Sequence, residues 1–226
     1  MAILPFPQDG CKVSPSLWNA SGVLWLHGLS GSGKSTLARN LSQELTHLGV
    51  NSFVLDGDSV RRGLNRDLGL SPEDRKENVR RTAEVARLMA QAGVFVIAAF
   101  ITPYEESRHL VRATMVQARI PYAECHVSCP LSLCMYRDPK GLYARARAGE
   151  VKGMTGLAAP FEEPGHPDLT VNTQGADVHE CVHTIVSFLR NRHMLVPVPD
   201  EEQTDAPMIN AKKSQDTEGI SSQQVV

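Results

Sequence analysis

One eight-residue segment constrains this chain more than any other feature. Residues 28–35 read Gly-Leu-Ser-Gly-Ser-Gly-Lys-Ser and fit the pattern G-x-x-x-x-G-K-[ST] at every fixed position. An apolar run over residues 23–27 precedes the segment, and residues 37–48 follow it with leucines on one helical face before Gly49. Strand, glycine loop and helix is the context in which this pattern holds phosphate groups. The segment therefore predicts a P-loop that binds a nucleoside triphosphate.

Each part of the loop has a chemical reason. The glycines let backbone N–H groups point at phosphate oxygens, and the following helix adds the positive end of its dipole. Lys34 can reach the β- and γ-phosphates, and the Ser35 hydroxyl is placed for Mg²⁺. The flanking strand and helix disfavour the alternative, a Gly/Ser-rich turn with an exposed lysine. The residues expected to bind ATP here are Gly28, Leu29, Ser30, Gly31, Ser32, Gly33, Lys34, Ser35 and Thr36.

Composition narrows what else the chain can do. Its 226 residues are 42% hydrophobic, which is enough for one α/β domain with tails. The net charge of −2 provides no basic field for nucleic acid or an anionic membrane. The longest apolar stretch, residues 94–101, is too short to span a bilayer, and the N-terminus lacks a secretion-signal pattern. We expect a cytoplasmic protein with no nucleic-acid or membrane partner.

The five cysteines agree with that compartment. Their odd number and irregular spacing do not suggest a disulfide framework, so a reducing environment is the simpler interpretation. Residues 125–129 read Cys-His-Val-Ser-Cys and could be forced into a metal site, but the second half of a four-ligand set is missing. Small thiols buried on a strand explain the pattern better.

Strand-like and helix-like segments alternate along the chain. The clearest helix begins at Ser71, which offers an N-cap before Pro72 and the carboxylate of Asp74, and it ends at Gly93. Such alternation implies a parallel sheet with helices on both faces and ligands at the carboxyl ends of its strands. The fold class is therefore α/β, a three-layer α/β/α domain of the P-loop NTPase type with a mostly parallel five-stranded sheet. The predicted strands are residues 23–27, 52–55, 94–100, 123–127 and 168–171.

An acidic pair indicates how the triphosphate is used. The third predicted strand ends without the aspartate of a Walker B motif, whereas the second is followed by Asp-Gly-Asp at residues 56–58. These carboxylates would lie beside the P-loop, within reach of Mg²⁺ and of an acceptor hydroxyl, as in small-molecule kinases. A turn that caps a helix is the alternative interpretation.

Basic residues point to an anionic acceptor. Guanidinium groups are frequent just after the acidic pair, and their forked N–H donors suit phosphate or sulfate. About half of them should be ordinary solvated charges, most readily Arg80, Arg81 and Arg87. A second basic stretch, residues 137–147, is typical of a lid that excludes water from the phosphates. The basic residues that follow the acidic pair are Arg61, Arg62, Arg66, Arg75, Lys76, Arg80 and Arg81.

Together these motifs resemble the adenylylsulfate kinases, which use ATP to phosphorylate the 3′-hydroxyl of adenosine 5′-phosphosulfate. The resemblance covers roughly residues 18–195, and several long motifs in the right order are more specific than the P-loop alone. The segments that carry it are residues 28–36, 56–65, 74–81, 137–149, 153–156 and 160–164.

The resemblance implies roles for individual residues. Asp58 is the expected catalytic base and acts with Lys34, while Arg137 lies over the ATP side and Lys140 in the lid contacts the acceptor. It also implies a homodimer. Mg²⁺ would be held by Ser35, Asp56 and Asp58. The implied substrate-binding residues are Asp58, Arg61, Leu70, Arg75, Asn78, Ile101, Thr102, Lys140, Gly153 and Met154.

The chain departs from the family at a few positions. Two phenylalanines that usually sandwich the acceptor adenine correspond to Leu70 and Met154, which cover a purine without the aromatic contribution. Thr102 stands where the family has a serine, and Ser59 where it has an asparagine. Two other functions therefore stay open, namely a kinase of another anionic nucleotide and a non-catalytic nucleotide switch. The absence of the guanine-reading motif Asn-Lys-x-Asp disfavours the switch.

The predicted domain organisation is simple. Residues 1–18 form an N-terminal arm, and residues 19–195 form the P-loop kinase domain with its lid at about residues 137–165. Residues 196–226 are acidic and polar with few large apolar groups, which predicts a disordered tail. Neither terminal segment is expected to take part in catalysis.

Overall fold

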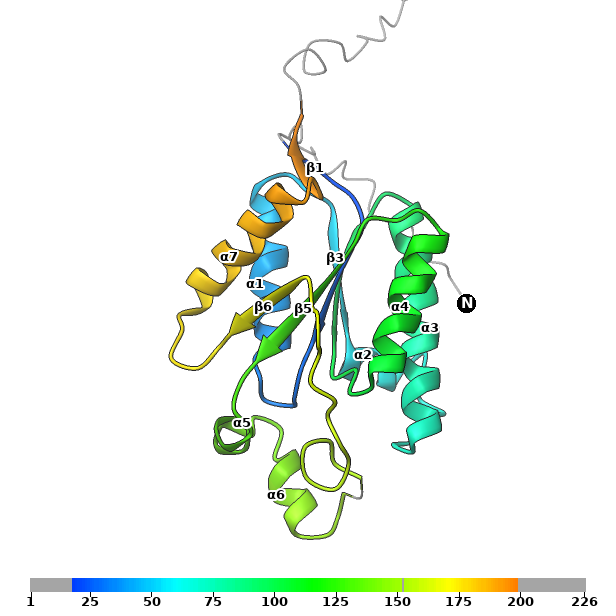
Figure 1. The fold of residues 1–226 in the computed structure, drawn as a ribbon, viewed down its shortest axis with the longest axis vertical. Helices are drawn as coiled ribbons and strands as arrows, with labels where there is room; N and C mark the ends of the chain where they lie inside the picture. Colours follow the sequence, from blue (N-terminus) through cyan, green and yellow to red (C-terminus); the bar gives the residue numbers. More distant parts are fainter. Residues whose placement is uncertain (1–17, 152, 199–226) are drawn as a thin grey trace, which may run out of the picture.

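The computed structural model describes residues 18–151 and 153–198. Its centre is a parallel five-stranded sheet in the order β3-β4-β2-β5-β6 (Figure 1). The predicted α/β class is confirmed, and each predicted strand is present within one residue of its expected bounds. The strands are β2 (Val23–His27), β3 (Ser52–Asp56), β4 (Phe95–Phe100), β5 (Tyr122–Ser128) and β6 (Leu169–Asn172).

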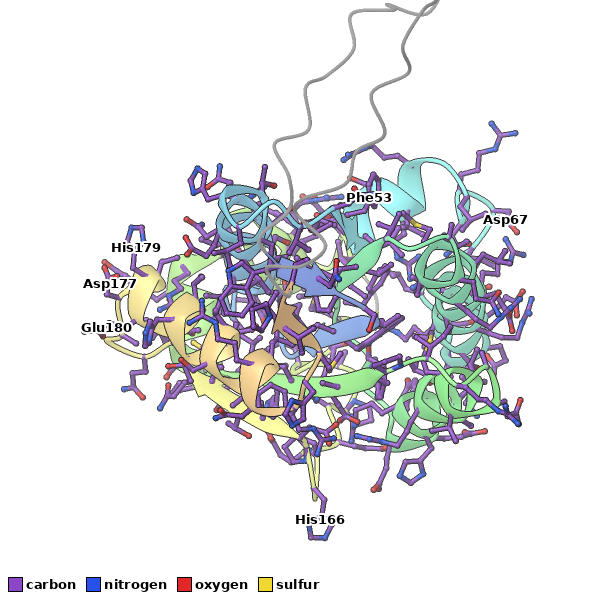
Figure 2. The ribbon with its side chains drawn as sticks, turned by 90° about the horizontal axis from the view of Figure 1, so that it is seen from above. Phe53, Asp67, His166, Asp177, His179 and Glu180 are labelled. Carbon is purple, nitrogen blue, oxygen red and sulfur yellow. The ribbon has the colours of Figure 1, made fainter. Side chains whose placement is uncertain are left out.

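Helices cover both faces of this sheet. Helices α1 (Lys34–His47) and α7 (Val178–Asn191) lie on one face, and α3 (Pro72–Gln91) and α4 (Glu105–Gln117) lie on the other (Figure 1). Seen from above, the sheet lies between these two layers of helices (Figure 2).

Strand β2 shows why both faces need cover. Leu24 and Leu26 belong to the core on the α1–α7 side, whereas Val23 and Trp25 belong to the core on the α3–α4 side. All four side chains are fully buried. A strand buried on both faces is a continuous apolar run, which is the pattern seen in the sequence before the P-loop.

The helix predicted from residue 71 is confirmed as α3. The Ser71 hydroxyl accepts a hydrogen bond from the Asp74 N–H at 3.1 Å, and Pro72 occupies the first turn, where no backbone donor is needed. The chain turns away at Gly93, which has a φ of 81°. Ordinary capping chemistry therefore sets both ends of this helix.

A small second sheet lies at the opposite end of the domain from the P-loop (Figure 1). Strand β1 (Trp18–Ala20) pairs antiparallel with β7 (Leu195–Pro197), with Trp18 opposite Pro197. The predicted boundaries lie at residues 18 and 196, and the backbone pairing of β1 with β7 joins the chain at both places. The remainder of the predicted arm and tail, residues 1–17 and 199–226, falls outside the described residues.

Short elements gather at the carboxyl ends of the strands. Helix α2 (Gly57–Arg62) follows β3 directly, and α5 (Leu131–Arg137) and α6 (Leu142–Arg147) lie beyond β5 (Figure 1). A separate apolar cluster, with Cys134, Tyr143 and Met154 buried in it, packs α5, α6 and the loop after α6 together. The predicted lid segment thus has its own small core. In the part of the chain that the structure describes, no helix is long and apolar enough to cross a membrane.

Candidate active site

The P-loop joins β2 to α1 at the carboxyl edge of the sheet. Gly28 and Gly31 have φ values of 149° and 77°, which side chains rarely tolerate. A Cβ atom on Gly28 would lie 2.5 Å from the Val127 carbonyl oxygen, and one on Gly31 would lie 2.8 Å from the Cys134 carbonyl oxygen. Neighbouring backbone therefore leaves room only for glycine at both positions.

Lys34, the first residue of α1, is buried inside this loop. Its ammonium group donates hydrogen bonds to the Leu29 carbonyl at 2.6 Å and to the Ser32 hydroxyl at 3.4 Å. Burial lowers the pKa of Lys34 to about 8. A phosphate group held by the loop would supply the negative charge that this ammonium lacks.

Asp56 ends β3 and serves two purposes. Its Oδ1 accepts the N–H of Asp58 at 3.0 Å and so caps α2, while its Oδ2 accepts the Ser35 hydroxyl at 2.6 Å. Burial raises the pKa of Asp56, but these hydrogen bonds outweigh that effect and hold the pKa below its usual value. An ionised carboxylate beside a hydroxyl suits Mg²⁺, which prefers oxygen ligands. The sequence left two interpretations of residues 56–58 open, a helix cap and a carboxylate beside the P-loop. Asp56 does both.

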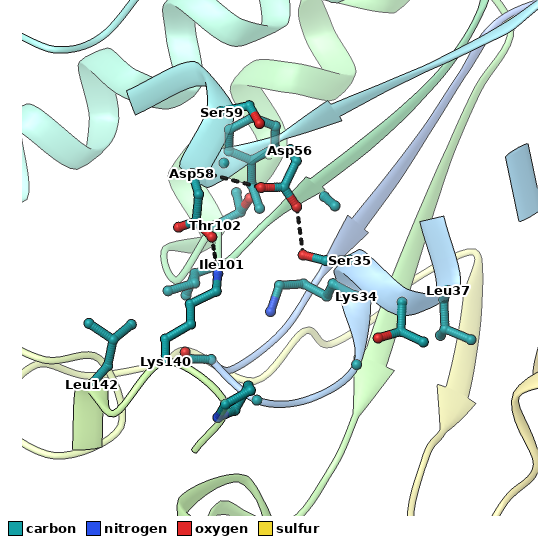
Figure 3. Close-up of a pocket in the computed structure, with 18 of the residues that line it drawn as sticks. Lys34, Ser35, Leu37, Asp56, Asp58, Ser59, Ile101, Thr102, Lys140 and Leu142 are labelled. Atoms are coloured by element: carbon teal, nitrogen blue, oxygen red, sulfur yellow. Dashed lines mark hydrogen bonds and ion pairs between the residues drawn. The ribbon is translucent and has the colours of Figure 1, made fainter. Parts of the chain in front are cut away.

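Asp58 faces the lid across the cavity. Its carboxylate forms an ion pair with Lys140, which comes from the turn between α5 and α6 (Figure 3). Both side chains are about half exposed, so solvent weakens this pair. Asp58, Lys34 and Lys140 border one cavity of about 900 Å³. The cavity therefore brings the expected base, the P-loop lysine and the lid lysine together.

Residues expected to hold the acceptor line the same cavity. Arg61, Asn78 and Thr102 are among them, from α2, α3 and the loop after β4. The fully buried Asn65 donates from Nδ2 to Asn78 Oδ1 at 3.0 Å and fixes the orientation of that amide. The sequence does not predict this role for Asn65, because nothing in the pattern of residues shows that a polar side chain in this loop is buried.

Arg75 joins α3 to the segment after α6. Its Nε donates to the Leu70 carbonyl at 3.0 Å, its Nη1 to the Thr155 hydroxyl at 2.8 Å and its Nη2 to the Gly153 carbonyl at 2.6 Å. The guanidinium lines the cavity yet is already engaged on all three nitrogens. An anionic acceptor would have to exchange with these oxygens.

Leu70 and Met154 occupy different environments. Leu70 lines the cavity and is 43% exposed, whereas Met154 is 5% exposed and packs in the small core of the lid. Met154 and the neighbouring Gly153 are not part of the cavity wall. The structure therefore does not bring the two expected base-covering side chains onto one wall, because burial in that core is favourable for the Met154 thioether.

Arg137 and Thr173 cover the other side of the P-loop. Arg137 Nη1 donates to the Gly31 carbonyl at 3.4 Å, and its Nη2 donates to the Thr173 carbonyl at 2.7 Å. The Thr173 hydroxyl in turn donates to the Ser32 carbonyl at 2.8 Å. Thr173 is not among the residues predicted from the sequence, although its place directly after the fifth strand indicates the ligand-binding edge.

The three arginines expected to be ordinary helix charges are not part of the cavity wall. Each forms an ion pair on the surface of α3, and exposed pairs of this kind contribute only about 0–1 kcal/mol each. The pairs are Arg80–Glu77, Arg81–Asp67 and Arg87–Glu84.

Comparison with known proteins decides which family has this site. A family model described as adenylylsulphate kinase matches residues 20–172. The chain belongs to the adenylylsulfate kinase family. A relative from Oceanobacillus iheyensis named adenylyl-sulfate kinase is 50% identical over 175 residues, covering 77% of this chain and 87% of the relative. Another from Geotalea daltonii with the same name is 50% identical over 173 residues, covering 76% and 84% of the two chains.

Solved structures agree with this family membership. The Mycobacterium tuberculosis APS kinase CysC, determined in complex with AMPPNP and APS, superimposes with a TM-score of 0.74 at 41% identity. The match covers 76% of this chain and 99% of that one. A hexameric APS kinase from Thiobacillus denitrificans matches with a TM-score of 0.59 at 31% identity, over 78% of this chain and 30% of that chain. The match to this family therefore covers most of the residues that the structure describes.

The buried ammonium of Lys34 predicts how nucleotide binding depends on pH. With a pKa of about 8, Lys34 loses its charge as the pH rises from 7 to 9, and phosphate oxygens then lose a cationic partner. We expect the Kd for ATP, measured calorimetrically with Mg²⁺, to rise about tenfold over this range. Lys34→Met should bind more weakly with a Kd that changes little over the same range. If the Kd of the unaltered protein for ATP did not change with pH, Lys34 would not be the cation that binds the phosphates.

Proposed function

We propose that this chain transfers the γ-phosphoryl group of ATP to the 3′-hydroxyl of adenosine 5′-phosphosulfate. The products are 3′-phosphoadenosine 5′-phosphosulfate and ADP. The observation that carries the proposal is the single cavity in which a P-loop lysine, Asp58 and the acceptor-side arginines meet. Family membership and the likeness to a kinase solved with AMPPNP and APS support it.

On the donor side, the chain binds and neutralises the triphosphate. P-loop N–H groups and the start of α1 hold the phosphate oxygens, and Lys34 balances the charge that spreads over the transferred group. The oxygens of Ser35 and Asp56, with Asp58 nearby, would hold Mg²⁺, which would neutralise the β- and γ-phosphates. Arg137 and Thr173 close the site on the far side of the loop.

On the acceptor side, Asp58 acts as general base. It aligns the 3′-hydroxyl and accepts its proton as the new bond from that oxygen to the γ-phosphorus forms. The bond from the γ-phosphorus to the bridging oxygen breaks, and ADP leaves with that electron pair. Arg61, Arg75 and Asn78 bind the phosphosulfate nucleotide, and their fork-like donors suit its anionic oxygens.

The lid contributes through Lys140. Its ion pair with Asp58 holds a cation over the cavity, and an entering anionic acceptor offers the ammonium a new partner. Asp58 is then released to face the hydroxyl. Cover by α5, α6 and the loop after them also limits the access of water, which would otherwise compete with the acceptor.

Two further expectations belong to this proposal. We propose a homodimer located in the cytoplasm, as the family resemblance and the composition imply. Light scattering of the purified chain would measure its assembly. A kinase of another anionic nucleotide stays the alternative, since Leu70 and Met154 replace the usual aromatic residues.

The reaction is tested by ADP release across a panel of acceptors. Adenosine 5′-phosphosulfate should give release well above the rate without acceptor, whereas guanine and cytosine analogues should give little. A non-catalytic switch would bind ATP without acceptor-dependent release. Preference for another base would overturn the acceptor assignment but leave the kinase standing.

Asp58→Asn tests the base. An amide cannot accept the hydroxyl proton, so we expect kcat to fall by about 10²-fold or more while ATP affinity changes little. Asp67→Asn is the matched control, because Asp67 pairs with Arg81 on the outer surface (Figure 2) and should leave kcat unchanged. Full activity in Asp58→Asn would remove Asp58 from the mechanism and favour Asp56.

Arg61→Lys and Arg75→Lys test the acceptor site. A lysine ammonium keeps the charge but not the planar fork, so either change should raise the KM for adenosine 5′-phosphosulfate much more than the KM for ATP. Arg87→Lys on the solvated face of α3 should change neither value. Equal effects on both substrates would mean that these arginines serve the donor side instead.

A further inference from the structure

Thr102, directly after the end of β4, is held in an unusual backbone conformation. Its φ is 41°, in the left-handed region that β-branched residues rarely adopt, and the residue is 2% exposed. Thr102 also lines the cavity on the acceptor side. Such strain persists only where surrounding groups impose it, and it is common at ligand sites.

Two buried donors from different elements hold this residue. Trp25 on β2 donates from its indole Nε1 to the Thr102 hydroxyl at 2.8 Å. Arg108 on α4 donates from Nη1 to the Thr102 carbonyl at 3.2 Å. Neither Trp25 nor Arg108 belongs to the cavity wall. Their hydrogen bonds to the site therefore run through Thr102, while Trp25 also stacks on Phe100, another residue of the cavity wall.

Burial of the Arg108 guanidinium is unfavourable, because it removes a charged group from water. Its side chain is 2% exposed, and its Nη2 has no hydrogen-bond partner among the described residues. Glu124 supplies the counter-charge, with Oε1 3.5 Å from Arg108 Nε. A well-packed apolar side chain usually serves stability as well as a buried ion pair does, so packing alone does not explain an arginine here.

The backbone around Thr102 joins three parts of the site. The Ile101 carbonyl accepts the N–H of Gly28, the first P-loop glycine, at 3.3 Å. The Pro103 carbonyl accepts the N–H of Glu162, at the end of the lid segment, at 2.9 Å. A shift of Thr102 would therefore move the acceptor wall relative to both the phosphates and the lid.

We infer that Trp25 and Arg108 are positioning residues that fix the acceptor wall through the Thr102 hydroxyl and carbonyl. This inference rests on the proposed function, because it assigns residues 101–102 to the acceptor side. The two residues touch neither substrate. They determine instead where the backbone of the wall stands with respect to the transferred phosphoryl group.

Trp25→Phe is the sharpest test. It keeps an aromatic ring that can stack on Phe100, 5.3 Å away between centroids, and removes only the N–H donor and part of the ring. We expect the KM for adenosine 5′-phosphosulfate to rise by up to about fivefold, the limit if the whole contribution of this internal hydrogen bond is coupled to acceptor binding, with the KM for ATP unchanged. Thr102→Val removes the same bond from the other side, so the double variant should be no worse than the single ones. Arg108→Lys, which keeps the charge, should show the same acceptor-specific rise.

Two variants serve as controls for folding effects. Tyr122→Phe removes a buried hydroxyl that has no hydrogen-bond partner in the described structure and lies in the same core as Trp25. Arg112→Met removes another cation near Glu124, one turn along α4, without a contact to Thr102. Both should leave the ratio of the two KM values unchanged, whatever they do to thermal stability.

The outcomes separate the inference from the proposed function. An acceptor-specific rise in Trp25→Phe and Arg108→Lys, absent from the controls, supports the inference. An equal rise in both KM values, or a fall in thermal stability with unchanged KM values, overturns it. Lack of acceptor-dependent ADP release in the unaltered protein would instead overturn the proposed function.

Discussion

The P-loop is held so closely by β5 and α5 that two of its positions, Gly28 and Gly31, leave room only for glycine. Carbonyl oxygens of Val127 and Cys134 occupy the space where side chains at Gly28 and Gly31 would lie. That contact fixes the loop relative to the sheet, and the loop fixes Lys34 and Ser35 at the start of α1. The cavity, the acidic turn after β3 and the lid are all arranged around this rigid element.

Polar groups of the site already have partners inside the chain. Asp56 binds Ser35, Asp58 pairs with Lys140, and Arg75 donates to backbone oxygens near the lid. A buried polar group without a partner costs about 1–3 kcal/mol, so the contacts of the buried Arg75 stabilise the chain when no ligand is bound, whereas solvent weakens the half-exposed pair of Asp58 and Lys140. Under the proposed function, substrate binding would exchange these partners for ligand groups, which favours ligands that satisfy the same donors at least as well.

Local signals predicted the fold well, and contacts between distant segments explain what they missed. The P-loop pattern and the cap at Ser71 depend on neighbouring residues, and both are confirmed. The pairing of β1 with β7 joins residues far apart in the chain, and three-residue strands carry almost no periodic signal. The burial of Met154 likewise depends on the packing of α5 and α6, which is a tertiary effect. The place of Thr173 after the fifth predicted strand already indicates the ligand-binding edge, but its contact with Ser32 depends on the order of the strands in the sheet.

The pairing of β1 with β7 also has a consequence for the geometry of the whole chain. Residues 18 and 197 face each other across one ladder, at the end of the domain away from the P-loop (Figure 1). The first and last strands of the described domain therefore lie side by side. A second domain attached at residue 18 or 197 would lie far from the nucleotide cavity. A short linker that joined residue 18 to residue 197 would permit circular permutation, with new termini placed in a surface loop.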